Sequence, residues 1–142
     1  MKYPRILLKL SGEFFGNALS ALDLKKVDEV AQVIVSLHKL GVQIGVVVGG
    51  GNIFRKRADE DKLLDPVQAD YMGILATAIN GIALKERLVA QGVHSVVQSA
   101  WPIRHVLAQV QPREAQKQLE QGVVVVFVAG TGQPLVTTDS GA

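Results

Sequence analysis

Four short runs of branched apolar residues, separated by segments with a helical repeat, constrain the fold more than any other feature of this sequence. The runs lie at residues 5–10, 42–48, 93–98 and 123–129. They show little alternation of apolar and polar residues, which is typical of parallel strands that are covered on both faces. Strands that alternate with helices predict an α/β fold, in which a mostly parallel sheet has right-handed crossovers and helices on both faces.

Three helices are predicted from apolar repeats and from signals at their ends. They are expected at residues 24–40, 66–91 and 113–121. Asp23 and Asp65 precede the first two as N-caps, because a carboxylate there accepts hydrogen bonds from free N–H groups of the first turn. Gly41, Gly92 and Gly122 follow the three helices, where glycine readily adopts the left-handed conformation that ends a helix.

The composition is that of a globular protein. The chain has 142 residues, the size of one domain, with 48% hydrophobic and 20% charged residues. It contains no cysteine, which excludes disulfides, thiolate catalysis and zinc–thiolate sites. The net charge is +2 without a long run of like charges, so no nucleic-acid partner is expected.

The apolar run before Lys9 is too short for a signal peptide or a membrane span, and we expect a cytoplasmic protein with no membrane partner.

Loops rich in glycine and hydroxyl residues follow three of the predicted strands, at residues 11–12, 49–52 and 130–138. In α/β folds, ligands bind beyond the carboxyl ends of the strands. The three consecutive glycines of the second loop leave backbone N–H groups free to hold phosphate oxygens, and Arg55 would add a planar charged group. The alternatives are that the glycines serve only the geometry of a turn, and that the basic run 55–57 is a solvated turn. Neither the Walker A pattern nor G-x-G-x-x-G fits this loop.

Two charged residues stand out because the sequence around them is apolar. Lys9 lies near the end of the first predicted strand, where it must be paired or face the ligand cleft; an edge-strand lysine that reaches water is the alternative. Ser11 and Gly12, directly after it, would supply further phosphate donors. Asp70 lies near the start of the second predicted helix, and the alternative to a ligand-binding role is a place on the solvated face of that helix. Four further residues are expected to be structural: His38, His94, His105 and Trp101.

Four motifs, in order along the whole chain, together resemble the bacterial uridylate kinases of the amino acid kinase superfamily. They are LLKLSGE at 7–13, VVVGGGNIFR at 46–55, ADYMGILAT at 69–77 with NG at 80–81, and AGTGQPLVTTDS at 129–140. The resemblance implies a three-layer α/β sandwich and the transfer of the γ-phosphoryl group of ATP to UMP, with Mg²⁺ carried by the nucleotide and no metal site in the protein itself. It also implies a homo-oligomer, a hexamer in the full-length family, that acts in pyrimidine nucleotide biosynthesis in the cytoplasm.

The resemblance further implies a role for each matching residue. Six residues would bind ATP: Lys9, Leu10, Ser11, Gly12, Gly51 and Arg55. Ten would bind UMP: Gly50, Asp70, Thr131, Gly132, Gln133, Pro134, Leu135, Val136, Thr137 and Thr138. As catalytic residues, Lys9 and Arg55 would stabilise charge on the transferred phosphoryl group, and Asp139 would orient Lys9 rather than act as a strong base. The Asp70 carboxylate would accept a hydrogen bond from a ribose hydroxyl.

The chain departs from the family in length and at several motif positions. Leu135 and Val136 stand where the family often has two aromatic residues, and Lys56 stands where it commonly has glycine. A helix-start signal at 137–140 is followed by only two residues. Residues 1–142 are therefore expected to form a single amino acid kinase-like domain, incomplete at its C-terminus, with the fourth strand as an uncovered edge and little activity alone. The alternatives are a non-catalytic nucleotide-binding or oligomer-interface fragment, or another kinase of the superfamily.

Overall fold

The sheet and its helices form the α/β architecture that the sequence predicts. The computed structural model describes residues 3–55, 64–134 and 136. Within these ranges the strands are β1 (Arg5–Leu10), β2 (Gln43–Val48), β3 (Ser95–Ser99), β4 (Ala108–Gln109) and β5 (Val124–Val128). The helices are α1 (Leu24–Lys39), α2 (Pro66–Ala90), α3 (Pro112–Glu120) and the short 3₁₀ helix η1 (Gly12–Phe15). The four predicted strands and three predicted helices are confirmed to within about two residues at each end, whereas β4 and η1 were not predicted.

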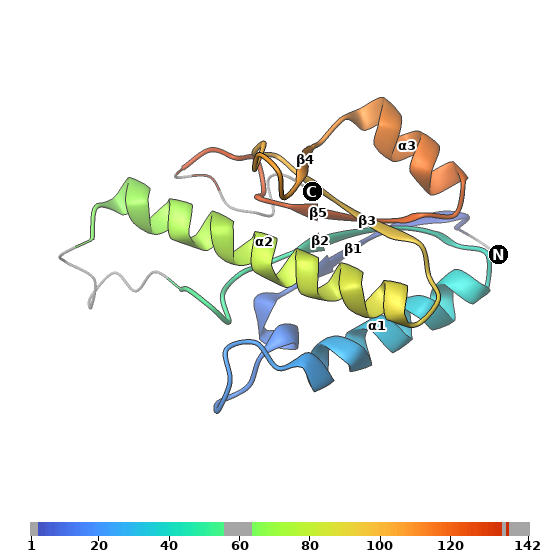
Figure 1. Ribbon diagram of the computed structural model, residues 1–142, viewed down its shortest axis with the longest axis horizontal. Coiled ribbons are helices and arrows are strands. Elements are labelled where there is room, and N and C mark those ends of the chain that lie inside the picture. The colour runs from blue at the N-terminus through green and yellow to red at the C-terminus, as the bar shows by residue number, and fades with distance from the viewer. Residues whose placement is uncertain (1–2, 56–63, 135, 137–142) are drawn as a thin grey trace.

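The strands pair in parallel in the order β1-β2-β5-β3-β4. Helices α1 and α2 lie on one face of the sheet and α3 lies on the other, so the three-layer arrangement is confirmed (Figure 1). Side chains of β5 alternate between the two layers, because successive residues of a strand point to opposite faces. Val124, Val126 and Val128 belong to the core beneath α1 and α2, whereas Val125 packs with Ala115 and Leu119 of α3.

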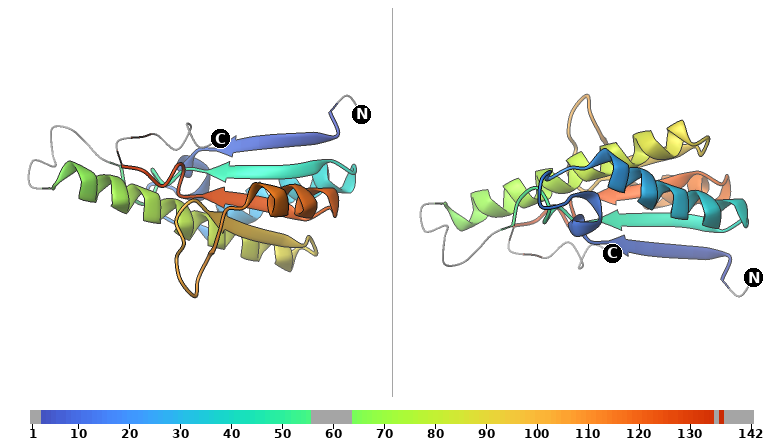
Figure 2. Two further views of the ribbon diagram at one scale, coloured as in Figure 1. Left: turned by 90° about the horizontal axis from the view of Figure 1, so that it is seen from above. Right: turned by 90° about the horizontal axis from the view of Figure 1, so that it is seen from below.

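Strand β5 lies in the middle of the sheet, between β2 and β3. The expectation that this fourth predicted strand is an uncovered edge is therefore wrong. The crossover through α3 returns the chain to the centre of the sheet, and the edges are β1 and β4. Figure 2 shows β1 at one edge in both views.

Strand β1 is less covered than its apolar sequence predicts. Its residues alternate between exposed and half-buried, and Leu7 keeps 49% of its surface exposed. The core helices cover the face that carries Ile6, Leu8 and Leu10, whereas α3 packs mainly on β5 and β2. The prediction of cover on both faces holds for β2, which is buried along most of its length, and is wrong for β1.

Local signals set the ends of the helices as predicted. Asp23 Oδ1 accepts a hydrogen bond of 2.9 Å from the Lys25 N–H, and Asp65 Oδ1 accepts from the N–H groups of Val67 and Gln68 at 3.0 and 3.1 Å. Two residues after the end of each α-helix lies a glycine with positive φ: Gly41 at 79°, Gly92 at 82° and Gly122 at 77°. Both kinds of signal act within one turn, so they do not depend on the rest of the fold.

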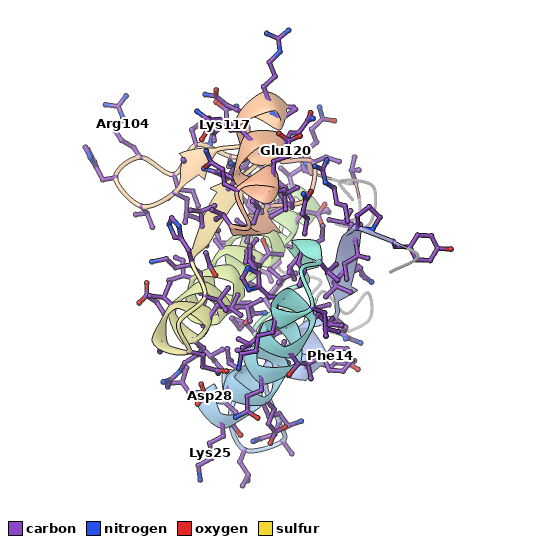
Figure 3. All side chains as sticks on the ribbon, turned by 90° about the vertical axis from the view of Figure 1, so that its right-hand side faces the viewer. Phe14, Lys25, Asp28, Arg104, Lys117 and Glu120 are labelled. Atoms are coloured by element: carbon purple, nitrogen blue, oxygen red, sulfur yellow. The ribbon has the colours of Figure 1, made fainter. Side chains whose placement is uncertain are left out.

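Charged side chains cover the outer faces of the helices. Figure 3 shows Lys25 and Asp28 projecting from α1, and Lys117 and Glu120 projecting from α3 at the opposite side of the molecule. Asp28 also joins the two helices of one layer, since its Oδ1 lies 3.4 Å from Arg87 Nε of α2. None of the described helices is long and apolar enough to cross a membrane.

Helix α2 approaches β5 closely at Gly81. A β-carbon on Gly81 would collide with the Val128 side chain, and Val126 and Val97 side chains lie 3.5 Å from the same position. Glycine at 81 is therefore required by packing, because an interior filled to crystal density has no room for an added methyl group.

We predict that Gly81→Ala destabilises the fold by about 1–3 kcal/mol, the usual cost of overpacking a core. Gly73→Ala is the matched control in the same helix, because nothing lies within 4 Å of its added β-carbon. In that open position alanine should raise stability by up to ~1 kcal/mol through its better helix propensity. Urea unfolding of the two variants measures the difference, and equal stabilities would contradict the close packing of α2 on β5.

Candidate functional site

The loops after β1 and β2 lie against each other at the carboxyl edge of the sheet. The two strands end in register, with Leu10 opposite Val48, and the Gly49 N–H donates to the Leu10 carbonyl at 2.8 Å. A β-carbon on Gly12 would lie 2.6 Å from the Gly51 nitrogen. The structure thus brings together four residues of the predicted ATP site: Leu10, Ser11, Gly12 and Gly51. Sequence spacing alone shows no such contact, because it depends on β1 and β2 being neighbours.

The glycine triplet is packed against the protein on its side-chain side. A β-carbon on Gly50 would lie 2.7 Å from the Ala76 β-carbon of α2. One on Gly51 would lie 3.1 Å from Arg55 Nη2. These glycines thus have a geometric role, because they let the loop approach α2 and let Arg55 fold back over the loop.

The same loop also presents unused backbone donors. The N–H groups of Ile53 and Phe54 both donate to the Gly50 carbonyl, at 3.0 and 3.1 Å, and close a tight turn. Among the described residues, no acceptor takes a hydrogen bond from the N–H groups of Gly50, Gly51 or Asn52. Consecutive N–H groups of this kind form an anion-binding concavity. The loop thus combines close packing with three donors that have no acceptor in the described part of the chain.

Arg55 is held over this loop by an ion pair that the sequence analysis did not identify. Its Nη2 lies 2.8 Å from Glu13 Oε1, and 57% and 70% of the two side chains are exposed. Glu13 is a residue of η1, which follows β1 directly. Lys56 and Arg57, the other members of the basic run, lie outside the described residues.

Lys9 lies on the edge strand, opposite Val47 of β2 and near the carboxyl end of β1. It is exposed, on the same face as Leu7. The edge position agrees with the alternative interpretation of Lys9, and the position near the strand end places it beside the loop that begins at Ser11. Asp139, which was predicted to orient Lys9, lies outside the described residues.

A cavity of about 210 Å³ lies between the glycine loop and the first half of α2. Asp70 is half-buried and lines it together with Gly50 and Gly51, so Asp70 faces a cavity rather than only solvent. Val136, from the loop after β5, also reaches it. The remaining lining residues are Phe54, Ala69, Gly73, Ile74 and Thr77. The cavity unites three of the residues predicted to bind UMP: Gly50, Asp70 and Val136.

The loop after β5 is attached to α2 by Trp101. The indole Nε1 donates to the Gly132 carbonyl at 2.6 Å, and the ring packs on Tyr71 with centroids 4.9 Å apart. Trp101 was predicted to be a packing residue, and it is one, but what it packs is the predicted UMP loop. In the sequence, its position two residues after β3, at the ligand edge of the sheet, is the feature that could have indicated this contact. Thr131 to Pro134 are described beside it, whereas Leu135, Thr137 and Thr138 lie outside the described residues.

A larger cavity of about 620 Å³ lies near the opposite edge of the sheet, beside β3 and β4. Its lining comes from α2, β3, α3 and the segment that contains β4, and includes Lys85, Gln98 and Gln118. It contains none of the residues predicted to bind nucleotide. Gly50 and Gly51 of the glycine loop, Asp70 and Val136 of the loop after β5 meet at the smaller cavity, which we therefore take as the candidate site.

The chain is similar in sequence to known uridylate kinases. The chain is 46% identical to the uridylate kinase of Acinetobacter baumannii over 143 residues, covering 99% of this chain and 59% of that protein. It is 46% identical to the uridylate kinase of Saccharophagus degradans, again over 99% of this chain and 58% of the relative. The chain therefore spans about three-fifths of the length of the curated relatives that it matches.

Solved structures of two UMP kinases also superpose on this chain. The UMP kinase of Ureaplasma parvum superposes with a TM-score of 0.89 at 36% identity, over 98% of this chain and 62% of that one. The UMP kinase of Bacillus anthracis gives 0.91 at 35% identity, over 98% and 58%. The model of the amino acid kinase family matches residues 4–142. On this evidence the chain belongs to the amino acid kinase family.

Proposed function

We propose that this chain carries the UMP site and the ATP phosphate loops of a UMP kinase, which transfers the γ-phosphoryl group of ATP to UMP. The observation that carries the proposal is that Gly50 and Gly51, whose N–H groups have no acceptor among the described residues, line the same cavity as Asp70. The relatives support it, because they are named uridylate kinases and the match covers 99% of this chain.

Phosphoryl transfer suits this set of residues. The reaction needs two polyanions held in line and positive charge on the transferred oxygens, with little covalent work for the protein. ATP phosphates would lie along Lys9 to Gly12 and against Gly51, with Lys9 and Arg55 supplying the charge. UMP would lie on the Gly50 side of the loop, and Asp139 would orient Lys9. Adjacent residues of one rigid loop would thereby fix the distance between the two substrates.

Magnesium would arrive with the nucleotide. Among the described residues, no group of three carboxylate or imidazole side chains could hold a metal ion. Mg²⁺ is commonly bound by substrate phosphates and only one or two protein carboxylates, so such a site does not require a protein cage.

Asp70 would recognise the ribose of UMP. The cavity of about 210 Å³ is smaller than the ~300–1,000 Å³ of a drug-sized ligand site, so it fits part of a nucleotide. A half-buried carboxylate in it would accept a hydrogen bond from a ribose hydroxyl. The uracil would then lie toward the loop that contains Thr131 to Thr138.

The helix α2 offers a surface for a second copy of the chain. Met72, Leu75 and Ile79 are 42%, 46% and 47% exposed, and they are spaced three and four residues apart along the helix. That spacing is typical of a seam between two helices, and isolated exposed apolar residues have no such order. The seam supports the proposal of a homo-oligomer, and it also favours the second candidate function, an oligomer-interface module.

We predict that Asp70→Ala weakens UMP binding by about 1.5–3 kcal/mol, the value of a hydrogen bond to a charged group. Isothermal titration with UMP measures the loss. Glu86→Ala is the control, because it removes an exposed carboxylate from the same helix outside the cavity. Equal losses in the two variants would show that only net charge matters and would remove Asp70 from the site.

We predict that the 142-residue chain binds UMP but turns it over at least ~10²-fold more slowly than a full-length relative, because one substrate held only by its phosphates loses effective molarity. UDP formation by this chain and by the Acinetobacter baumannii enzyme, followed in a coupled assay, gives the ratio. A difference within about tenfold, ~1.4 kcal/mol of barrier, would show that this chain contains the ATP site.

We predict that Leu75→Glu reduces self-association, because a charge on the seam would be desolvated at the interface. Sedimentation equilibrium should show a shift toward the monomer. Val33→Glu places the same charge on an apolar residue of α1 that is 61% exposed, more than Leu75, and should leave the mass unchanged. An unchanged mass for Leu75→Glu would exclude this face as the contact.

A further inference from the structure

Two asparagine side chains form a reciprocal amide pair behind the glycine loop. Asn80, in the middle of α2, is 0% exposed. Its Nδ2 donates to the Gly49 carbonyl and to Asn52 Oδ1, both at 2.7 Å. In return, Asn52 Nδ2 donates to Asn80 Oδ1 at 3.1 Å and to the Ala21 carbonyl at 2.7 Å.

The outer partners of the pair determine how both amides are turned. The Gly49 and Ala21 carbonyls only accept hydrogen bonds, so an NH₂ group must face each of them. Turning either amide would place two oxygens against each other. The four hydrogen bonds are therefore consistent with one arrangement, and each amide fixes the orientation of the other.

The pair holds both ends of the segment that presents the unused donors. Asn80 binds the backbone at Gly49, and Asn52 is itself the last residue of the glycine loop. Gly50 and Gly51 lie between these two attachment points, and both line the candidate cavity. The loop has few side chains of its own, so contacts from α2 and from Asn52 must limit its movement.

Helix α2 contains a second buried polar group that acts on another loop. Thr77, 0% exposed, donates to the Ile74 carbonyl at 2.6 Å and accepts from the Ala129 N–H at 2.8 Å. Asn80 differs from it because its hydrogen bonds reach the glycine loop, at the Gly49 carbonyl and the Asn52 side chain. An apolar residue at position 80 would satisfy the core but would leave the Gly49 carbonyl without a donor.

We infer that Asn80 and Asn52 are positioning residues, which fix the glycine loop so that its N–H groups are aligned for phosphate before a ligand arrives. Neither side chain is assigned to the binding of substrate. The inference rests on the proposed function, since it takes the loop to bind phosphate. Preorganisation of donors matters because a loop ordered only on binding loses affinity to its own ordering.

The test compares Asn80→Leu, Asn52→Leu and the double variant. Each single variant leaves the amide of the other asparagine without its partner and should lower the melting temperature, whereas the double variant removes that unpaired amide and recovers this part of the loss, with the Gly49 and Ala21 carbonyls still without these donors. Two further readouts separate positioning from stability: affinities for UMP and for inorganic tripolyphosphate by titration calorimetry, and amide hydrogen exchange of residues 49–54. Gln98→Leu is the control, a buried amide on β3 that bonds to Gln118 away from this loop.

We expect the double variant to be more stable than either single variant while both affinities stay at least about tenfold weaker, ~1.4 kcal/mol, and loop exchange stays fast. Gln98→Leu should lower stability with affinity and loop exchange unchanged. Recovery of affinity together with stability in the double variant would overturn the inference, because the pair would then be only structural. Unaltered loop exchange in Asn80→Leu would overturn it too. Failure of the unmodified chain to bind either probe would instead overturn the proposed function, whatever the exchange rates.

Discussion

The close approach of two backbones, at Gly12 and Gly51, is the constraint on which the site depends. The approach leaves no space for a β-carbon on Gly12, and it follows from the parallel pairing of β1 with β2 up to Leu10 and Val48. Each strand ends at the same level, so the chain must turn away twice within a small volume. Only a loop with minimal side chains can do this while leaving N–H groups unused. Close packing therefore requires glycine here, and the proposed binding of phosphate would favour the same residue.

Helix α2 connects the glycine loop with the loop after β5, because its side chains form hydrogen bonds with both. Gly81 allows the helix to lie close to β5, and that closeness brings Thr77 within hydrogen-bond distance of the Ala129 N–H. Ala129 is buried with φ of +69°, a conformation that costs a non-glycine residue energy and needs support from its surroundings. One helix thus supports the loops after two strands, and Asp70 near its start lines the cavity between them.

The sequence predicted features that depend on nearby residues and missed those that depend on strand order. The caps at Asp23 and Asp65 act within one helical turn, so their pattern was sufficient. The exposure of Leu7 was not predictable, because nothing within β1 indicates that β5, rather than β1, occupies the centre of the sheet. Asn80 was quoted as part of a motif without a role, because a lone polar residue in a helical pattern is more often on the surface than buried. The fold class could be predicted, and so could the grouping of Gly50 with Asp70 in one site. The hydrogen bonds of Asn80 that hold the glycine loop could not.

The ion pair between Arg55 and Glu13 explains how a charged residue can be held in place and still serve a ligand. Both side chains are more than half exposed, and exposed pairs contribute about 0–1 kcal/mol. A phosphate offers the guanidinium two charge-assisted hydrogen bonds, which are roughly twice as strong as neutral ones. Exchange of Glu13 for phosphate would therefore cost little, while the pair keeps Arg55 over Gly51 until the exchange occurs. A buried partner would have held Arg55 more firmly but would have been left as an uncompensated charge once phosphate bound. The weakness of this ion pair is thus compatible with the proposed role of Arg55, and its geometry places the guanidinium beside the loop whose N–H groups are unused.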